Sequence, residues 1–242
     1  MNPIWLITRK EISSFFNSLM AYVILIVFLF ICGIFTWFYG IFVGDIFIRG
    51  QADLMAFFIN GALPAIGLFI PAITMGAIAK ERKSGTIELL LTKSLTNSQL
   101  VIGKFLACLL LIAIALIFTF PYLVTVSQIG DLDLGRTLAG YFGLFLISAA
   151  YISLGLFASS ITEDQVVAFV LSLIMGICFF ILFSVLGNNL SGTASEIFNY
   201  SSFFTHYEPM VRGVIDSRDV IFFLSITFLG LLLTINQVSK RK

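Results

Sequence analysis

The sequence predicts an all-α integral membrane protein that crosses the bilayer six times. Of its 242 residues, 59% are hydrophobic and 11% are charged, whereas soluble domains carry about 25% charged residues. The mean hydropathy is +1.06. About 20 apolar residues in a helix cross a bilayer core of roughly 30 Å, and six runs are long enough. The predicted spans lie near residues 20–43, 57–79, 101–127, 137–161, 166–186 and 219–236.

Residues 1–19 precede the first span and are predicted to form an amphipathic interface helix. Trp5, Phe15 and Phe16 gather on one side, and Arg9 and Lys10 gather on the other. The pattern leaves two roles open, an anchor for the first span or a docking surface for a partner. The following apolar run is too long for the core of a signal peptide, so we expect it to stay in the mature chain. The candidate residues are Trp5, Arg9, Lys10, Glu11, Phe15 and Phe16.

Residues 20–242 are predicted to form one six-span membrane domain whose loops differ in charge. An even number of spans leaves both termini on the same side, and that side carries ten of the fourteen Lys and Arg residues. Because cytoplasmic loops are enriched in these residues, we expect both termini in the cytoplasm. The expected location is the cell inner membrane, which the chain would cross several times. The ten residues are Arg9, Lys10, Lys80, Arg82, Lys83, Lys93, Lys104, Lys240, Arg241 and Lys242.

The loop KERKSGTIELLLTK, residues 80–93, gathers charges around an apolar patch. Gly85 with Glu88 three residues later, and Thr96 with Gln99 three residues later, indicate two helix starts, of which the second is a capping box. The first helix is too short to cross a membrane and is apolar on one side, which suits a groove on another protein. A loop that rests on lipid headgroups is the alternative interpretation.

Residues 187–218 mix apolar residues with turn formers, which predicts short helices that re-enter the exoplasmic leaflet. His206 is the only histidine of the chain, and no second His or Cys lies near it in sequence. A metal site is therefore disfavoured, and a hydrogen-bonded structural role is the favoured interpretation.

Small residues inside the spans indicate packing. Ala149 with Ser153, and Ser172 with Gly176, have the spacing of close helix contacts, either within the subunit or between subunits. The cysteines lie far apart in apolar runs, so we expect core residues and neither a disulfide nor a metal site. They are Cys32, Cys108 and Cys178.

Several function classes are disfavoured by what the sequence lacks. There is no GxxxxGK[ST] loop for nucleotide phosphates, so the chain is not predicted to be an ATPase of that class. Ionisable residues are nearly absent from the spans away from their ends, which argues against an ion-coupled carrier or channel. No catalytic constellation stands out, and no cofactor or nucleic-acid partner is expected. The sequence leaves one alternative function open, that of a membrane anchor that moves no substrate.

The stretch KERKSGTIELLLTKSLTNSQLVIGKFLA resembles the cytoplasmic loop and third span of permease subunits of the second type of ABC exporter. One departure is that many members have Pro near Ser94. The stretches KEISSFFNSLMAYV and FFTHYEPMVRGVIDSRDVIFFLS resemble the family's interface helix and its segment before the sixth span. The matched residues of the loop and third span are Glu81, Arg82, Gly85, Thr86, Glu88, Leu89, Leu90 and Lys104.

The resemblance implies a six-helix permease that exports a substrate. It would pair with a second permease, as a heterodimer rather than a homodimer, and with two copies of a separate ATPase that binds ATP and magnesium. Membrane lipids are the other expected partner. Residues 85–95 would form the coupling helix, and residues 1–18 a second contact with the ATPase.

Within the family, KEISSFFNS and HYEPMVRGVIDSRD most resemble the permease associated with gliding motility in Bacteroidetes. That resemblance implies a link to a motility or secretion machine. The candidate residues of the exoplasmic segment are His206, Glu208, Gly213 and Asp219.

Overall fold

The computed structural model describes residues 3–38, 54–85, 96–128 and 130–240. These ranges contain helices and no strand, which confirms the predicted all-α class. Three short stretches, labelled η, are π-helical. In chain order the helices are α1 (Pro3–Phe16), α2 (Leu19–Gly33), η1 (Ile34–Phe38), η2 (Phe57–Ala62), α5 (Leu63–Thr74), α6 (Ala79–Lys83), α8 (Asn97–Ile117), α9 (Phe120–Ser127), α10 (Leu134–Ile161), α11 (Gln165–Ile177), η3 (Cys178–Leu182), α12 (Phe183–Asn189), α13 (Thr193–Ser201), α14 (Phe203–Val211) and α15 (Ser217–Lys240).

Five helices in the described part of the chain are long and apolar enough to cross a membrane. They overlap the predicted runs from 57–79 onward. The first predicted span, 20–43, lies partly outside the described residues and stays a prediction. Its described part, Ala21–Trp37, meets the same test only when joined to Pro3–Phe16, from which it is bent by 76°. The five helices are Phe57–Lys83, Asn97–Ser127, Leu134–Ile161, Gln165–Asn189 and Ser217–Lys240.

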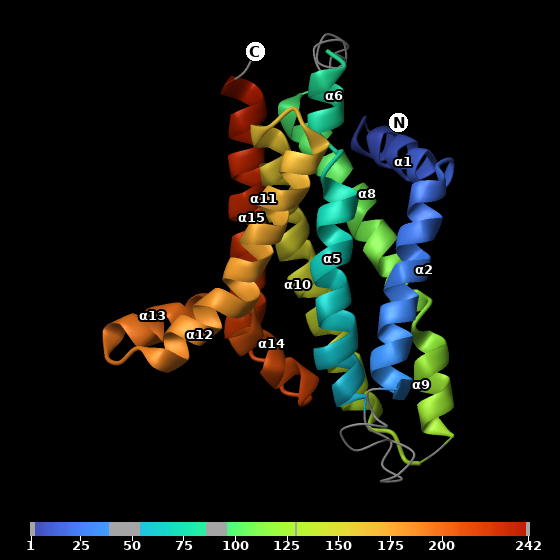
Figure 1. Cartoon of the computed structure of the whole chain (residues 1–242), viewed down its shortest axis with the longest axis vertical. Helices are drawn as coiled ribbons and strands as arrows, with labels where there is room; N and C mark the ends of the chain where they lie inside the picture. Colours follow the sequence, from blue (N-terminus) through green and yellow to red (C-terminus); the bar gives the residue numbers. More distant parts are fainter. Residues whose placement is uncertain (1–2, 39–53, 86–95, 129, 241–242) are drawn as a thin grey trace.

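The long helices form a bundle, and two parts depart from it (Figure 1). Helix α1 lies across one end, and the hairpin of α12 and α13 projects from the side. The first arm of the hairpin, α12, is the last part of the membrane-crossing helix Gln165–Asn189, and α14 lies between the hairpin and α15 in the chain. The interval 187–218 therefore contains the short helices that its mixed composition predicts.

Local sequence signals explain several helix boundaries. Thr96 and Gln99 form the predicted capping box, with Gln99 N donating to Thr96 Oγ1 over 3.3 Å and Thr96 N donating to Gln99 Oε1 over 3.1 Å. Asp164 caps α11 by accepting from Val166 N over 2.8 Å. The helix breaks between α8 and α9 just before Pro121, because proline has no N–H to donate and crowds the preceding turn.

Helix α10 is the centre of the bundle. It packs against α5, α8, α11, α14 and α15, and its glycine and serine positions let their backbones come close. Ser153 faces Gly230 of α15, Gly155 faces Thr74 of α5, and Tyr151 lies against Gly176 of α11. The Tyr151 hydroxyl also donates to the Ser172 carbonyl of α11 over 3.1 Å. Three members of the small-residue pairs predicted from the sequence, at positions 153, 172 and 176, therefore make contacts within the subunit. The cysteine thiols are all free, and those of residues 32 and 108 are buried in the core.

The contact between α10 and α15 at Gly230 is so close that it gives a testable prediction. A methyl group added there lies within 3.0 Å of the Ser153 backbone carbon, whereas one added at Gly67 meets no atom within 4 Å. We expect Gly230→Ala to lower the free energy of unfolding by about 1 to 3 kcal/mol relative to Gly67→Ala, because overpacking a close contact forces the helices apart. Thermal unfolding of the purified chain in detergent measures the difference. Equal melting temperatures would contradict the assigned contact.

Candidate functional site

Both chain ends and α6 lie at the same end of the bundle (Figure 1). We call this region the α6 end. It consists of α1, α6, the first two turns of α8 and the last turns of α10 and α15. Most of the residues that the resemblance assigns to ATPase coupling belong to α6 or to the chain that follows it. The polar contacts at this end therefore define the candidate site.

Ser159 of α10 holds the turn between α5 and α6. Its hydroxyl accepts hydrogen bonds from Ile78 N and Ala79 N, each over 3.1 Å, and donates to Met75 O over 3.0 Å. One hydroxyl has a single hydrogen to donate and two lone pairs to accept with, so its bonding capacity is fully used. The start of α6 is thereby attached to the central helix.

Arg82 attaches the end of α6 to two further helices. Its guanidinium donates to the Ser160 carbonyl of α10 and, over 3.3 Å, to the Gln237 carbonyl of α15. Carbonyls near the last turn of a helix lack partners within the helix and attract a cation. The predicted coupling residue Arg82 is thus part of the bundle and links α6, α10 and α15.

Lys104 of α8 joins α8 to α1 and α6. Its side chain is only 2% exposed, and its ammonium lies 3.0 Å from Glu11 Oε1 of α1 and 2.8 Å from Glu81 Oε1 of α6. A buried cation is retained only where anions and hydrogen-bond acceptors compensate for the water it has lost. The two carboxylates supply that compensation, so three elements distant in sequence meet at one charge.

Helix α1 packs on α8 beside this cluster. Ile7 lies so close to Gly103 that a methyl group at residue 103 would approach Ile7 Cγ2 to 2.7 Å. The Thr8 hydroxyl is within hydrogen-bonding distance of the Gly103 carbonyl at 3.1 Å and of the Ile4 carbonyl at 2.9 Å. The face of α1 that meets the bundle therefore contains Ile7, Thr8 and Glu11.

The predicted residues of the interface helix are distributed differently. Trp5 is 54% exposed, although the periodicity grouped it with the apolar side. Phe15 and Phe16 are half-buried and pack against the core. Arg9 and Lys10 are exposed. The two phenylalanines thus face the bundle, whereas Trp5 and the two cations face outward.

The candidate coupling residues are described in part. Glu81 and Arg82 lie in α6 with the contacts given above, and Gly85 follows the helix with a positive φ of 67°, a conformation that glycine adopts without strain. The other four lie outside the described residues, so the coupling helix and the alternative of a headgroup-bound loop both stay predictions. These four are Thr86, Glu88, Leu89 and Leu90.

Sequence reasoning missed the contacts of Ile7, Thr8 and Ser159. It identified Lys104 as one of the ten basic residues of the predicted cytoplasmic side and as a matched position of the family pattern, but not as the centre of a cluster. One signal was available, since Lys104 is a cation inside an apolar run and therefore requires an acidic partner. Nothing local shows that the partners are Glu11 and Glu81, which are 93 and 23 positions away in the sequence.

At the opposite half of the bundle, His206 joins α14 to α15. Its Nδ1 lies 2.6 Å from Asp219 Oδ1, its Nε2 lies 2.8 Å from the Tyr200 carbonyl, and its ring stacks on Phe222. A carbonyl only accepts, so Nε2 is the donor of the second bond. The described residues contain no group of three or more potential metal ligands. The hydrogen-bonded structural interpretation of His206 agrees with these contacts.

The remaining candidates of this segment lie around α14. Glu208 pairs with Arg212 one turn later. Gly213 follows the helix with a φ of 90° and packs against Arg136 of α10. Burial raises the pKa of Tyr207 well above its usual value, so its phenol is neutral. None of these contacts brings the residues into a catalytic arrangement.

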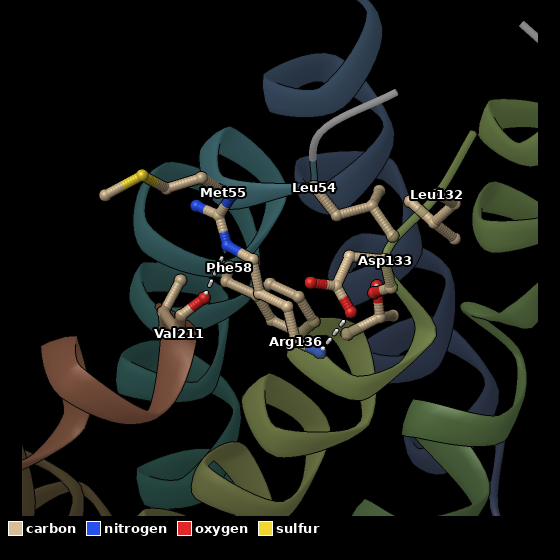
Figure 2. A pocket seen from close by; sticks show the side chains of 8 residues that line it. Leu54, Met55, Phe58, Leu132, Asp133, Arg136 and Val211 are labelled. Atoms are coloured by element: carbon tan, nitrogen blue, oxygen red, sulfur yellow. Dashed lines mark hydrogen bonds between the residues drawn. The ribbon is translucent and has the colours of Figure 1, made fainter. Parts of the chain in front are cut away.

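A small cavity lies where η2, α10 and α14 meet (Figure 2). Its volume is about 20 Å³, which is enough for one water molecule. Arg136 donates from Nε to the Val211 carbonyl and from its backbone N to Asp133 Oδ1, each over 3.0 Å. The arrangement fastens α14 to the start of α10, and the space is too small for a transported substrate.

The helical fold and its apolar spans define a multi-pass membrane protein. Residues 43–235 match a family model described as ABC-2 family transporter protein. The match covers most of the chain, which therefore belongs to the ABC-2 transporter family. Proteins of this family are permease components of ABC transporters and work with a separate ABC ATPase. A search of curated proteins found no match.

The buried charge of Lys104 gives a stability test. We expect Lys104→Met to lower the free energy of unfolding by about 3 to 5 kcal/mol, because Glu11 and Glu81 lose their shared cation in a buried site. Thermal unfolding in detergent measures the change.

Lys10→Met is the matched control, because Lys10 is exposed on α1. Adding Glu11→Gln and Glu81→Gln to Lys104→Met removes the uncompensated charges and should restore most of the stability. A single Lys104→Met variant as stable as the control would contradict the role assigned to this cluster.

Proposed function

We propose that this chain is the membrane-spanning permease subunit of an ATP-driven exporter, and that the partner ATPase docks at the α6 end. The observation that carries the proposal is the attachment of α6 to its neighbours. Glu81 reaches Lys104 of α8, and Arg82 reaches carbonyls of α10 and α15. A displacement of α6 is therefore passed to three membrane-crossing helices and, through Glu11, to α1.

The coupling segment is the stretch between α6 and α8 in the sequence. Both flanks of this segment carry a residue of the Lys104 cluster. Glu81 lies before the segment, and Lys104 lies after it. A partner that moves this segment acts on both flanks together. The apolar residues Ile87, Leu90 and Leu91 supply the face that enters the partner's groove, as an amphipathic helix does.

The remaining features of the proposed subunit follow from the charge pattern and the family resemblance. The chain crosses the cell inner membrane six times, with both termini in the cytoplasm. It pairs with a second permease as a heterodimer, and ATP with magnesium binds to the ATPase. The stretches KEISSFFNS and HYEPMVRGVIDSRD support a role in gliding motility.

The topology can be tested with single cysteines in a chain whose three native cysteines are replaced by serine. We expect Ser84→Cys and Ser239→Cys to react with a membrane-impermeant thiol reagent only from the cytoplasmic side, and Ser191→Cys only from outside. All three positions are exposed. Labelling of residues 84 and 239 from opposite sides would contradict the common location of α6 and the carboxyl terminus.

The coupling segment can be tested by mutating its central residues. We expect Glu88→Gln to weaken capture of the ATPase by about 2 to 5 kcal/mol, because it removes a charge that is desolvated in the contact with the partner. If Glu88 stayed exposed to solvent, the same substitution would change the binding free energy by only about 0 to 1 kcal/mol. Leu90→Asp should weaken capture further by placing a charge in the apolar contact. The measurement is co-purification of the ATPase with the tagged chain in mild detergent.

Glu163→Gln is the control, because Glu163 is an exposed acid of the loop between α10 and α11 at the same end of the bundle. Expression and membrane insertion of every variant are compared with those of the wild type. If Glu88→Gln and Leu90→Asp capture the ATPase as well as the control does, the partner docks elsewhere.

A further inference from the structure

An open groove separates the α12–α13 hairpin from α14. Its volume is about 540 Å³, within the range of about 300 to 1,000 Å³ typical of ligand sites. Figure 1 shows the hairpin projecting from the side of the bundle, to the left of α14. The polar residues that line the groove are Ser184, Asn188, Asn199, Thr205, Glu208 and Arg212.

Both walls of the groove are held in place by contacts within the chain. On the hairpin side, α13 packs so closely on α12 that a methyl group at Gly187 would lie 2.9 Å from Asn199 N. The Ser195 hydroxyl also donates to the Gly187 carbonyl over 2.6 Å. On the other side, His206 fastens α14 to Asp219 of α15. The groove is therefore a built feature of the fold.

An exposed apolar stripe leads towards the groove. Ile174, Ile177, Ile181 and Val185 are exposed and follow one another at intervals of three and four residues along Gln165–Asn189, across the π-helical stretch η3. Asn188, three residues after Val185, lines the groove. An apolar stripe that ends in a polar groove at the end of a membrane-crossing helix suits a molecule with an acyl chain and a polar headgroup.

The charges in the groove indicate what kind of headgroup fits. Glu208 and Arg212 form an ion pair, yet their side chains are 33% and 61% exposed. The pair uses Glu208 Oε1 and Arg212 Nη2, which leaves Glu208 Oε2 for an ammonium and the other guanidinium donors for a phosphodiester. A headgroup with both charges can bind without breaking the pair.

We propose that the groove binds a zwitterionic phospholipid with a primary ammonium, that is, phosphatidylethanolamine, in the leaflet opposite the chain termini. The ammonium donates to Glu208, the phosphodiester accepts from Arg212, and an acyl chain lies along the stripe from Val185 to Ile174. The proposal is independent of the partner ATPase, because every residue in it lies on this chain and away from the α6 end.

Native mass spectrometry of the full chain in mild detergent tests the proposal. Phosphatidylethanolamine, phosphatidylcholine and phosphatidylglycerol with identical acyl chains are titrated in parallel. We expect phosphatidylethanolamine to bind about tenfold more tightly than either of the others, the scale of one charge-assisted hydrogen bond. Phosphatidylcholine has no N–H to donate to Glu208, and phosphatidylglycerol has no cation.

Glu208→Gln should abolish the preference, because the ammonium loses its anionic acceptor. Arg212→Gln should weaken the binding of all three lipids alike, because each contains the phosphodiester. Glu196→Gln and Arg218→Gln should change neither the affinities nor the preference. The two control residues are exposed charges near the groove that do not line it. Thr205→Trp fills the groove from an exposed position without touching the ion pair, and it should also abolish the preference. Equal binding of the three lipids to the wild type would overturn the proposal. So would a preference that survives both Glu208→Gln and Thr205→Trp.

Discussion

The buried ammonium of Lys104 is the interaction on which the α6 end depends. A cation with 2% exposure needs carboxylates in contact with it, and Glu11 and Glu81 meet that need from two elements far apart in the chain. The requirement brings α1 across the end of the bundle and holds α6 against α8. Arg82 extends the same attachment to α10 and α15. A chain with few charges thus uses several of them to attach the elements at one end of the bundle to one another.

The middle of the bundle is held together by different means. Ser153 and Gly155 of α10 meet Gly230 of α15 and Thr74 of α5, and Tyr151 packs on Gly176 of α11. A small residue at each contact lets the helices approach closely, which matters because lipid gives helices no hydrophobic reason to associate. Because these contacts lie inside the subunit, they leave the outer face of α11 and α12 uncovered. Only 17% of the most apolar window of Gln165–Asn189 is buried, against 83% for Leu134–Ile161. This difference is what gives the chain a lipid-facing stripe beside its groove.

The two ends of the molecule use buried ionisable groups in a similar way. Lys104 attaches elements at one end, and the contact of His206 with Asp219 attaches α14 to α15 in the other half. In both places the polar partners are largely buried, with side-chain exposures of 18% or less, so the contacts attach one element firmly to the next. The α12–α13 hairpin projects beyond the second attachment. Its separation from α14 creates the groove in which Glu208 and Arg212 meet solvent.

The sequence by itself determined the features that depend on neighbouring residues. The length of the apolar runs predicted the membrane class and the positions of the five helices in the described residues that are long and apolar enough to cross a membrane. The Thr96 and Gln99 pair predicted the start of α8, and Pro121 predicted a break. Hydrophobicity, helix capping and the effect of proline each depend on residues that are close in the sequence. Features that arise from them can therefore be predicted from the sequence alone.

Only the tertiary structure decided which side chains meet across the fold. The contacts of Lys104 with Glu11, of His206 with Asp219 and of Ser159 with Ile78 join residues 93, 13 and 81 positions apart. Periodicity grouped Trp5 with the apolar side of α1, yet Ile7 and Thr8 are the residues that face α8. A period identifies the faces of a helix but not the neighbour of each face, because that choice depends on the packing of all the other helices.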